Sequence, residues 1–216
     1  MRVAVINETS AADKNPHILG ALSGRGFEVM NVGMCKRDTT PELTYIHTGL
    51  LAAVFLGTRS ADVVVGGCGT GQGFLNSCMQ YPGVFCGLIA DNLDAWLFRQ
   101  INGGNCISLP LNQGYGWAGE VNLRFIFDAF FSVASGEGYP ESRRESQQAS
   151  RRTLAAISRS THRPMAEILQ TLDADVVVPA LSYPGVVESL DFSGPESAGI
   201  AESIRSRLDA EQGALR

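Results

Sequence analysis

A glycine-rich segment, residues 66–73 (Gly-Gly-Cys-Gly-Thr-Gly-Gln-Gly), constrains the fold of this chain more than any other feature. It follows the apolar run Ala61–Val65 and precedes Phe74–Met79, which has helical spacing. The pattern predicts a buried strand, a tight turn and a helix. Cys68 and Thr70 then lie at a helix N-terminus, where backbone N–H groups attract negative charge and favour thiolate over thiol. Such a loop can hold an anionic group, use Cys68 chemically, or do both.

Short apolar runs alternate with longer helical patterns over the first part of the chain. Runs rich in Val, Ile and Cys are typical of buried parallel strands, and helices between them imply repeated strand–helix–strand units. We therefore predict an α/β fold, a Rossmann-like three-layer αβα sandwich with a five-stranded parallel sheet. The predicted strands are 2–7, 28–33, 62–67, 85–90 and 106–110. The predicted helices are 16–24, 41–56, 73–81, 93–102 and 116–135.

The organisation changes near residue 160. We predict a sugar-isomerase-like domain over residues 1–160, on the resemblance described below, which ends in a basic helix at 141–160. Residues 161–216 form a mostly helical C-terminal extension, packed on the domain or on a partner subunit. Within it we expect helices at 164–172 and 195–208, and an extended segment at 176–187 that contains two prolines.

The bulk composition excludes several classes of protein. With 216 residues, 44% hydrophobic and 18% charged, the chain is globular rather than disordered. A formal net charge of -5 without a basic stripe argues against a nucleic-acid partner. No apolar run reaches the roughly 18 residues of a membrane helix, so we expect no membrane partner. The chain starts directly in a strand and its five cysteines include no C-x-x-C pair, which predicts reduced thiols and a cytoplasmic protein.

Candidate site residues follow from the predicted sheet, because ligands of open parallel sheets bind beyond the carboxyl ends of the strands. We expect Glu8, Cys68, Thr70 and Asn102 to converge on one edge, where they could move protons and hold sugar hydroxyls. Each has a plainer interpretation: core filler for Cys68, helix cap for Thr70, solvated loop for Glu8 and turn residue for Asn102.

Metal and nucleotide sites are not predicted. The cysteine spacings do not fit a zinc site, and Cys78, Cys86 and Cys106 are interpreted as core residues. Gln72 stands where a phosphate-binding loop needs Lys, and the alternating glycines miss the dinucleotide pattern G-x-G-x-x-G. We therefore expect no metal and no cofactor.

Three segments resemble one known family. Cys68–Gly73 resembles the C-G-T-G-x-G loop of the ribose-5-phosphate isomerase B and galactose-6-phosphate isomerase family. Tyr45–His47 looks like the Y-P-H of that family, and Arg99–Asn105 is similar to its R-Q-H-N-D-x-N segment. The similarity covers about residues 1–160.

The resemblance implies a metal-free aldose–ketose isomerase, an intramolecular oxidoreductase that acts on a pentose or hexose such as ribose 5-phosphate or galactose 6-phosphate. Cys68 would be the base that moves a proton between C1 and C2 through a cis-enediolate, and Thr70 would steady the enediolate. The family's site is shared between subunits, which implies a homodimer, or a tetramer built from dimers. The implied substrate contacts are Glu8, Gly69, Gly71, Gly73, Asn102 and Arg143.

The chain also departs from the family pattern. Ile101 aligns with the family's ring-opening histidine, Gln147 aligns with its second phosphate-binding arginine, and Glu8 and Thr9 replace an Asp-His pair. These changes predict a sugar other than ribose 5-phosphate, phosphorylated or not. The alternative is a non-catalytic sugar or sugar-phosphate binding protein that retains the isomerase fold.

Overall fold

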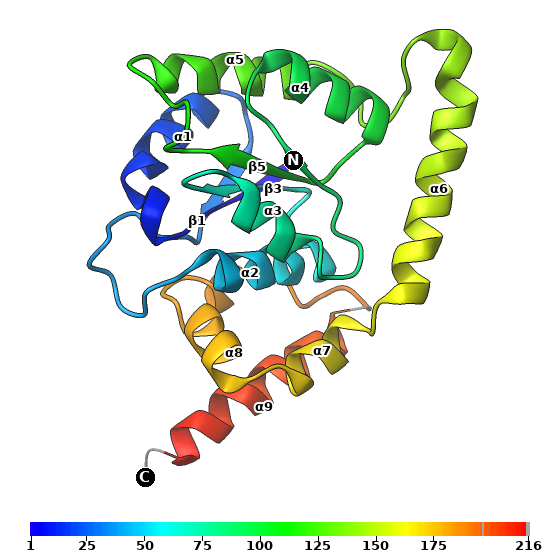
Figure 1. Ribbon diagram of the computed structural model, residues 1–216. Helices are drawn as coiled ribbons and strands as arrows, with labels where there is room; N and C mark the ends of the chain where they lie inside the picture. Colours follow the sequence, from blue (N-terminus) through cyan, green and yellow to red (C-terminus); the bar gives the residue numbers. More distant parts are fainter. Residues whose placement is uncertain (196, 215–216) are drawn as a thin grey trace.

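The computed structural model describes residues 1–195 and 197–214, and its centre is a five-stranded parallel sheet of order β2-β1-β3-β5-β4. Helices cover both faces, so the predicted Rossmann-like three-layer αβα sandwich is confirmed (Figure 1). The strands are β1 (Arg2–Asn7), β2 (Glu28–Asn31), β3 (Val63–Cys68), β4 (Cys86–Leu88) and β5 (Cys106–Pro110).

Two separate hydrophobic cores lie on the two faces of the sheet. Successive strand residues point to opposite faces, so Val3 and Val5 of β1 enter one core while Ala4 and Ile6 enter the other. The first core lies under α1 (Asn15–Leu22), α4 (Asn92–Leu97) and α5 (Gly119–Phe131). The second lies under α2 (Tyr45–Gly57) and α3 (Gln72–Cys78). Short helices η1 (Thr9–Lys14) and η2 (Phe98–Asn102) complete this part.

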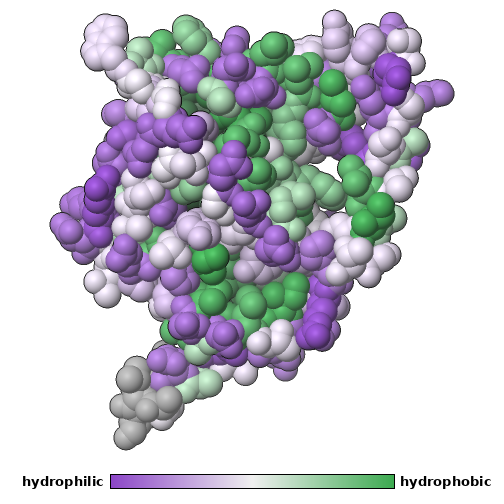
Figure 2. Space-filling model, viewed as in Figure 1, coloured by the Kyte–Doolittle hydropathy of each residue, from purple (hydrophilic) through white to green (hydrophobic). Residues whose placement is uncertain are grey.

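Helix α6 (Arg144–Thr161) follows η3 (Glu141–Arg143) and stands apart from the layers. It flanks the amino ends of the strands, whose arrowheads point away from it (Figure 1). Leu154 and Ile157 of α6 are about half exposed, as is Met79 just after α3. Figure 2 shows hydrophobic side chains on α6 and on the body beside it, on the same face of the molecule.

The C-terminal residues form helices that pack beneath α2. These are α7 (Met165–Thr171), α8 (Ala174–Leu181), η4 (Val187–Ser189) and α9 (Ala198–Ala214). Met165, Leu169 and Val177 belong to the same buried core as Leu50 and Leu51 of α2. No helix in the described part of the chain is long and apolar enough to cross a membrane.

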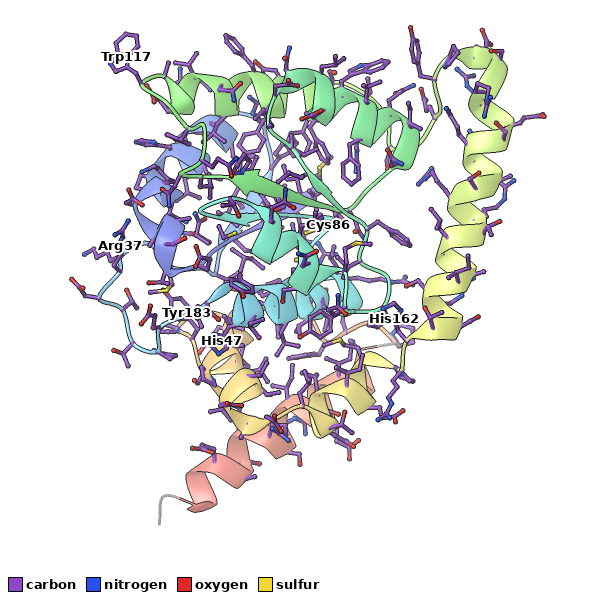
Figure 3. All side chains as sticks on the ribbon, viewed as in Figure 1. Arg37, His47, Cys86, Trp117, His162 and Tyr183 are labelled. Carbon is purple, nitrogen blue, oxygen red and sulfur yellow. The ribbon has the colours of Figure 1, made fainter. Side chains whose placement is uncertain are left out.

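The prediction of an extended segment at 176–187 is wrong, because its first half belongs to the helix α8 and turns follow. Its β-branched valines and Pro179 favour extended backbone locally, but burial against α2 outweighs that preference. Pro179 cannot donate to the carbonyl oxygen of Asp175 one turn earlier. His47 Nε2 lies 3.0 Å from that oxygen and supplies the missing hydrogen bond. Figure 3 shows His47 between α2 and α8, close to Tyr183.

Candidate active site

The turn after β3 has the geometry that its glycines suggest. Gly71 has a φ of +75°, and a Cβ atom there would lie 2.5 Å from Leu88 Cδ1. A Cβ atom at Gly67 would lie 2.2 Å from the carbonyl oxygen of Leu109. Glycine is therefore required at both positions, one for conformation and one for close approach of two strands. The turn carries Cys68 to the carboxyl edge of the sheet and starts α3.

Cys68 is buried, with 6% of its surface exposed, and its backbone is fixed on two sides. Its carbonyl oxygen accepts hydrogen bonds from the N–H of Gly71 at 3.3 Å and of Leu111 at 3.0 Å. The next carbonyl, Gly69, accepts from the N–H of Asn112 at 3.0 Å and of Gln113 at 2.8 Å. The loop is thus tied to the segment that follows β5, so the sulfur is held on a rigid support.

Glu8 reaches the same loop through Ser10. The Ser10 hydroxyl donates to the buried Glu8 carboxylate and accepts from the Gly69 N–H at 3.1 Å. Asn112 Nδ2 donates to the Ser10 carbonyl oxygen at 3.0 Å. A carboxylate, a hydroxyl and the cysteine loop therefore form one connected network at the carboxyl edge, as the sequence predicted for Glu8 and Cys68.

The Thr70 hydroxyl and the glycine N–H groups of this loop differ in whether they already have a hydrogen-bond partner within the chain. Thr70 is exposed and its hydroxyl accepts from the Gln72 N–H at 3.3 Å, although the N-cap residue of α3 is Gly71. The N–H groups of Gly69 and Gly71 already donate within the chain. The Gly73 N–H has no acceptor among the described residues. The half-exposed Tyr45 ring lies against Gly73, where a Cβ atom would come within 3.0 Å of it.

Asn102 does not join this edge, so the expected convergence on one edge is wrong for that residue. Asn102 precedes β5, and the first residue of β5, Cys106, pairs with Val64 near the start of β3. Cys68, the last residue of β3, pairs with Pro110 at the carboxyl end of β5. These two pairs are four residues apart along the strands, so at 3.3 Å per residue the two edges are about 13 Å apart. The connection that precedes a parallel strand lies at its amino edge, which the sequence reasoning overlooked.

Arg143 also lies away from Cys68, in η3 at the start of the α6 arm. Its side chain is exposed and makes no hydrogen bond or ion pair with the described residues. Within one chain, the residues predicted for the site thus fall into two groups. Glu8, Cys68 and the loop occupy the carboxyl edge, while Asn102 and Arg143 belong to the amino-edge side.

A cavity of about 220 Å³ opens at the amino edge, between η2 and α6. Ile101, Asn102, Gln147 and Arg151 are among its lining residues. The Gln147 side chain makes two hydrogen bonds to the backbone of Tyr139, each of 2.8 Å: its Oε1 accepts from the Tyr139 N–H, and its Nε2 donates to the Tyr139 carbonyl oxygen. Gln147 therefore fixes the loop before α6.

The Arg151 guanidinium is held in place by this loop. Its Nη1 donates to the Gly136 carbonyl oxygen at 3.0 Å, and the guanidinium lies where a Cβ atom at Gly103 or Gly136 would be. Arg151 therefore presents a positioned positive charge at the cavity.

Arg99 lies near Arg151 and increases the positive charge of this edge. Burial, and secondarily the Arg151 charge, lowers the pKa of Arg99. Its Nη1 donates to the Gly104 carbonyl oxygen at 3.1 Å, while its buried Nε has no partner in the described part of the chain. No carboxylate forms a salt bridge with either guanidinium among the described residues. An anion in the cavity would meet the Arg151 guanidinium, with the Arg99 charge nearby.

Sequence reasoning missed three residues of the carboxyl edge. Ser10, Tyr45 and Asn112 all contact or pack against the cysteine loop. Ser10 and Asn112 each stand within three residues of a strand's carboxyl end, which was the available signal. Tyr45 belongs to the segment that matched the family motif, although its contact with Gly73 has no signature in the local sequence.

Comparison with known proteins identifies the family. The model of the ribose/galactose isomerase family matches residues 3–149. The chain is a member of that family. It is therefore a sugar isomerase, and its reaction class is that of an intramolecular oxidoreductase.

Two crystal structures match almost the whole chain. A 4-deoxy-L-threo-5-hexosulose-uronate ketol-isomerase complexed with a tartrate is 39% identical, with 97% of this chain and 100% of that chain covered and a TM-score of 0.91. A ribose-5-phosphate isomerase from Vibrio parahaemolyticus is 41% identical, with 96% and 99% covered and a TM-score of 0.90. A type B ribose 5-phosphate isomerase from Trypanosoma cruzi covers 74% of this chain at 19% identity and a TM-score of 0.63, which shows the fold alone.

Proposed function

We propose that this chain is a ketol isomerase of an open-chain sugar acid, with Cys68 as the base. The substrate class has an aldehyde at C1, a hydroxyl at C2 and a carboxylate at the far end, as in a 4-deoxy-5-hexosulose uronate. The observation that carries this choice is Ile101, a side chain without a proton to transfer, in the cavity where the family resemblance puts the ring-opening acid.

The chemistry of such an acid removes the need for ring opening. A pyranose ring closes through the C5 hydroxyl and a furanose ring through the C4 hydroxyl. A 4-deoxy-5-hexosulose has a ketone at C5 and no hydroxyl at C4, so neither ring forms from C1. An isoleucine is then acceptable, and the relative described as acting on such a uronate supports this substrate class.

The charge at the amino edge also supports a carboxylate rather than a phosphate dianion. Gln147 is neutral and is occupied by the Tyr139 backbone. Arg151 remains as a positioned guanidinium, and a bidentate Arg–carboxylate pair is a strong charge-assisted contact. We propose that Arg151 binds the substrate carboxylate, that Asn102 holds a hydroxyl and that Arg143 contributes weaker, solvated charge.

The two edges can act together only across a subunit interface. Cys68 and Asn102 lie at opposite edges of the sheet, which are about 13 Å apart along the strands, so one site needs the carboxyl edge of one subunit and the amino edge of another. The exposed Leu154 and Ile157 on α6 are apolar surface that a second copy would cover. We therefore propose a homodimer with two shared sites, and a role for residues 161–214 in supporting α2 behind the cysteine loop.

The proposed reaction conserves all atoms. The Cys68 thiolate takes the C2 proton, and the electron pair of the C2–H bond forms the C1–C2 double bond while the C1 carbonyl becomes an oxyanion. The Gly73 N–H and the Thr70 hydroxyl stabilise this cis-enediolate. Cys68 then returns the proton to C1 as the O2 proton passes to O1, which leaves a ketone at C2 and a hydroxyl at C1.

Isomerisation in deuterated water tests the proposal. The purified protein is incubated with 4-deoxy-L-threo-5-hexosulose-uronate, ribose 5-phosphate or galactose 6-phosphate, and proton NMR follows deuterium at C1 and C2. We expect kcat/KM for the uronate to exceed that for each phosphate by at least about a hundredfold, as for a site with a mismatched polar group. Faster turnover of either phosphate would assign the enzyme to phosphorylated sugars. Binding of all three without exchange would favour the binding-protein alternative.

A further inference from the structure

Three cysteines that lie far apart in the sequence meet at the amino edge of the sheet. The sulfur atoms of Cys78, Cys86 and Cys106 all lie within 4.8 Å of one another, and the Cys106 and Cys78 sulfurs are 3.9 Å apart. All three are free thiols, not disulfides. Cys78 and Cys106 are core residues, as predicted, and Cys86 packs against the same core, but the sequence did not indicate that the three sulfurs cluster.

The fold itself positions the cluster. Cys86 and Cys106 are the first residues of β4 and β5 and pair directly in the parallel register, so their side chains share one face of the sheet. Cys78 is the last residue of α3, the helix that covers this face. Three secondary-structure elements therefore direct one sulfur each to a common point.

The three sulfur atoms lie close enough to bind one ion together. A thiolate is the form that binds metal, and a bound ion displaces the thiol protons.

A path from solvent reaches the cluster through the cavity of about 220 Å³. Cys86 is half-buried and, with Met79, lines that cavity. The thioether sulfur of Met79 lies 3.3 Å from the backbone nitrogen of Cys86. Figure 3 shows Cys86 at the end of the sheet that faces α6.

We propose that Cys78, Cys86 and Cys106 form a binding site for a thiophilic metal ion, and that Cu(I) is the ion it fits best. The three thiolates and the nearby thioether are soft ligands, which select Cu(I) over hard ions such as Mg²⁺. Structural zinc requires four thiolate, imidazole or carboxylate ligands, and no His, Asp or Glu belongs to the cluster in the described residues. Sulfur separations near 4 Å suit a small ion between three thiolates.

The cluster borders the cavity that holds Arg151 and Asn102, but it lies at the opposite edge of the sheet from the proposed base Cys68. Cys86 and Cys106 start strands at the amino edge, whereas Cys68 ends β3 at the carboxyl edge. A bound ion would crosslink α3, β4 and β5. It would therefore raise the thermal stability of the protein, by an amount that grows with the logarithm of the free ion concentration above the Kd.

Competition for Cu(I) tests the site. The reduced protein is titrated without oxygen against the coloured Cu(I) complex of bathocuproine disulfonate, for wild type, Cys86→Ser and Cys35→Ser. Cys35 is exposed and outside the cluster, so it is the matched control. We expect one equivalent bound by wild type and by Cys35→Ser. Cys86→Ser should bind at least about tenfold more weakly, because loss of even an outer-shell partner costs about 10- to 100-fold.

X-ray absorption on the Cu(I)-loaded wild type gives a result that does not depend on how the variants fold. Three sulfur neighbours and no nitrogen or oxygen neighbour would support the cluster. Two sulfurs with a nitrogen or oxygen ligand, an unchanged affinity in Cys86→Ser, or a loss of binding in Cys35→Ser would each overturn it.

Discussion

The two edges of the sheet are built in different ways. At the carboxyl edge, one short loop brings the cysteine, the hydroxyl and the amides together, and backbone contacts to the segment after β5 fix them. At the amino edge, three thiols, two guanidiniums and a cavity come from α3, β4, β5, η2 and α6. The first edge is rigid and tightly packed, and the second is open and positively charged.

This difference assigns the two edges different parts of the reaction. A rigid thiol suits proton transfer, which depends on geometry within hydrogen-bond reach. A cationic cavity suits recognition of an anionic group. Changes at the carboxyl edge should therefore affect kcat, and changes at the amino edge should affect KM or metal binding.

The largest effect is expected from Cys68→Ala. Removal of the base should lower kcat by at least about 10²-fold, the scale of general-base catalysis. The measurement is the rate of deuterium incorporation into the uronate, with Cys35→Ala as the control for loss of an exposed thiol. Exchange at the wild-type rate in Cys68→Ala would move the chemistry away from the carboxyl edge.

The packing of the two edges can be compared with two glycine substitutions. Gly71 and Gly83 have φ values of +75° and +72°, but only at Gly71 would an added Cβ atom have neighbours within 4 Å, Leu88 Cδ1 being the nearest at 2.5 Å. Gly83→Ala should lower the free energy of unfolding by about 1 kcal/mol, from backbone strain alone. Gly71→Ala should lower it by at least about 2 kcal/mol, because overpacking adds about 1–3 kcal/mol. Equal losses in urea unfolding would mean that the carboxyl edge is not tightly packed.

At the amino edge, Arg151→Gln should raise KM for the uronate by about tenfold or more, since a hydrogen bond to a charged group contributes about 1.5–3 kcal/mol. Its kcat should change little. Arg143→Gln is the matched control, because Arg143 is exposed and lacks partners among the described residues. Steady-state kinetics in which Arg143→Gln has the larger effect on KM would put the anion at η3 rather than in the cavity.

The last prediction concerns the contribution of Cys86 to stability and its dependence on pH. Its pKa is lowered from 9.0 to about 5 by hydrogen bonds from Cys106 and Cys78. The unfolded chain therefore binds more protons between these values, and stability from Cys86 rises with pH across that window. This contribution of Cys86 to the free energy of unfolding is fully present above about pH 9 and is lost as the pH falls through about 5. The free energy of unfolding of wild type minus that of Cys86→Ser should grow from pH 5 to pH 9. A flat difference would show that Cys86 is an ordinary buried thiol.

The carboxyl edge was predictable because its information is local. The octapeptide at 66–73 specifies strand, turn and helix by itself, and the alternation of apolar runs specifies the parallel sheet. The bounds of β5 agree with the prediction at both ends, and those of β4 are shorter because only Cys86–Leu88 pair with β5.

The amino edge was not predictable, because its groups meet only through tertiary packing. Cys78 and Cys106 are separated by 28 residues, and their convergence depends on strand register and helix placement. The helix α8 was missed for a similar reason, since its stability depends on α2 and on the hydrogen bond from His47 to Asp175. Asn102 was assigned to the wrong edge because its position before β5 was not used.

The central claim is that each site combines the carboxyl edge of one subunit with the amino edge of another. Two impaired variants are co-expressed with different tags: Cys68→Ala, which lacks the base, and the double variant Asn102→Ala/Arg151→Gln, which binds substrate weakly. The mixed dimer is isolated and assayed at a substrate concentration well below the KM of the double variant. In a two-fold dimer one of the two sites is then intact, so the mixed dimer should recover about half of the wild-type activity. A mixed dimer no more active than its Cys68→Ala parent would contradict the shared site.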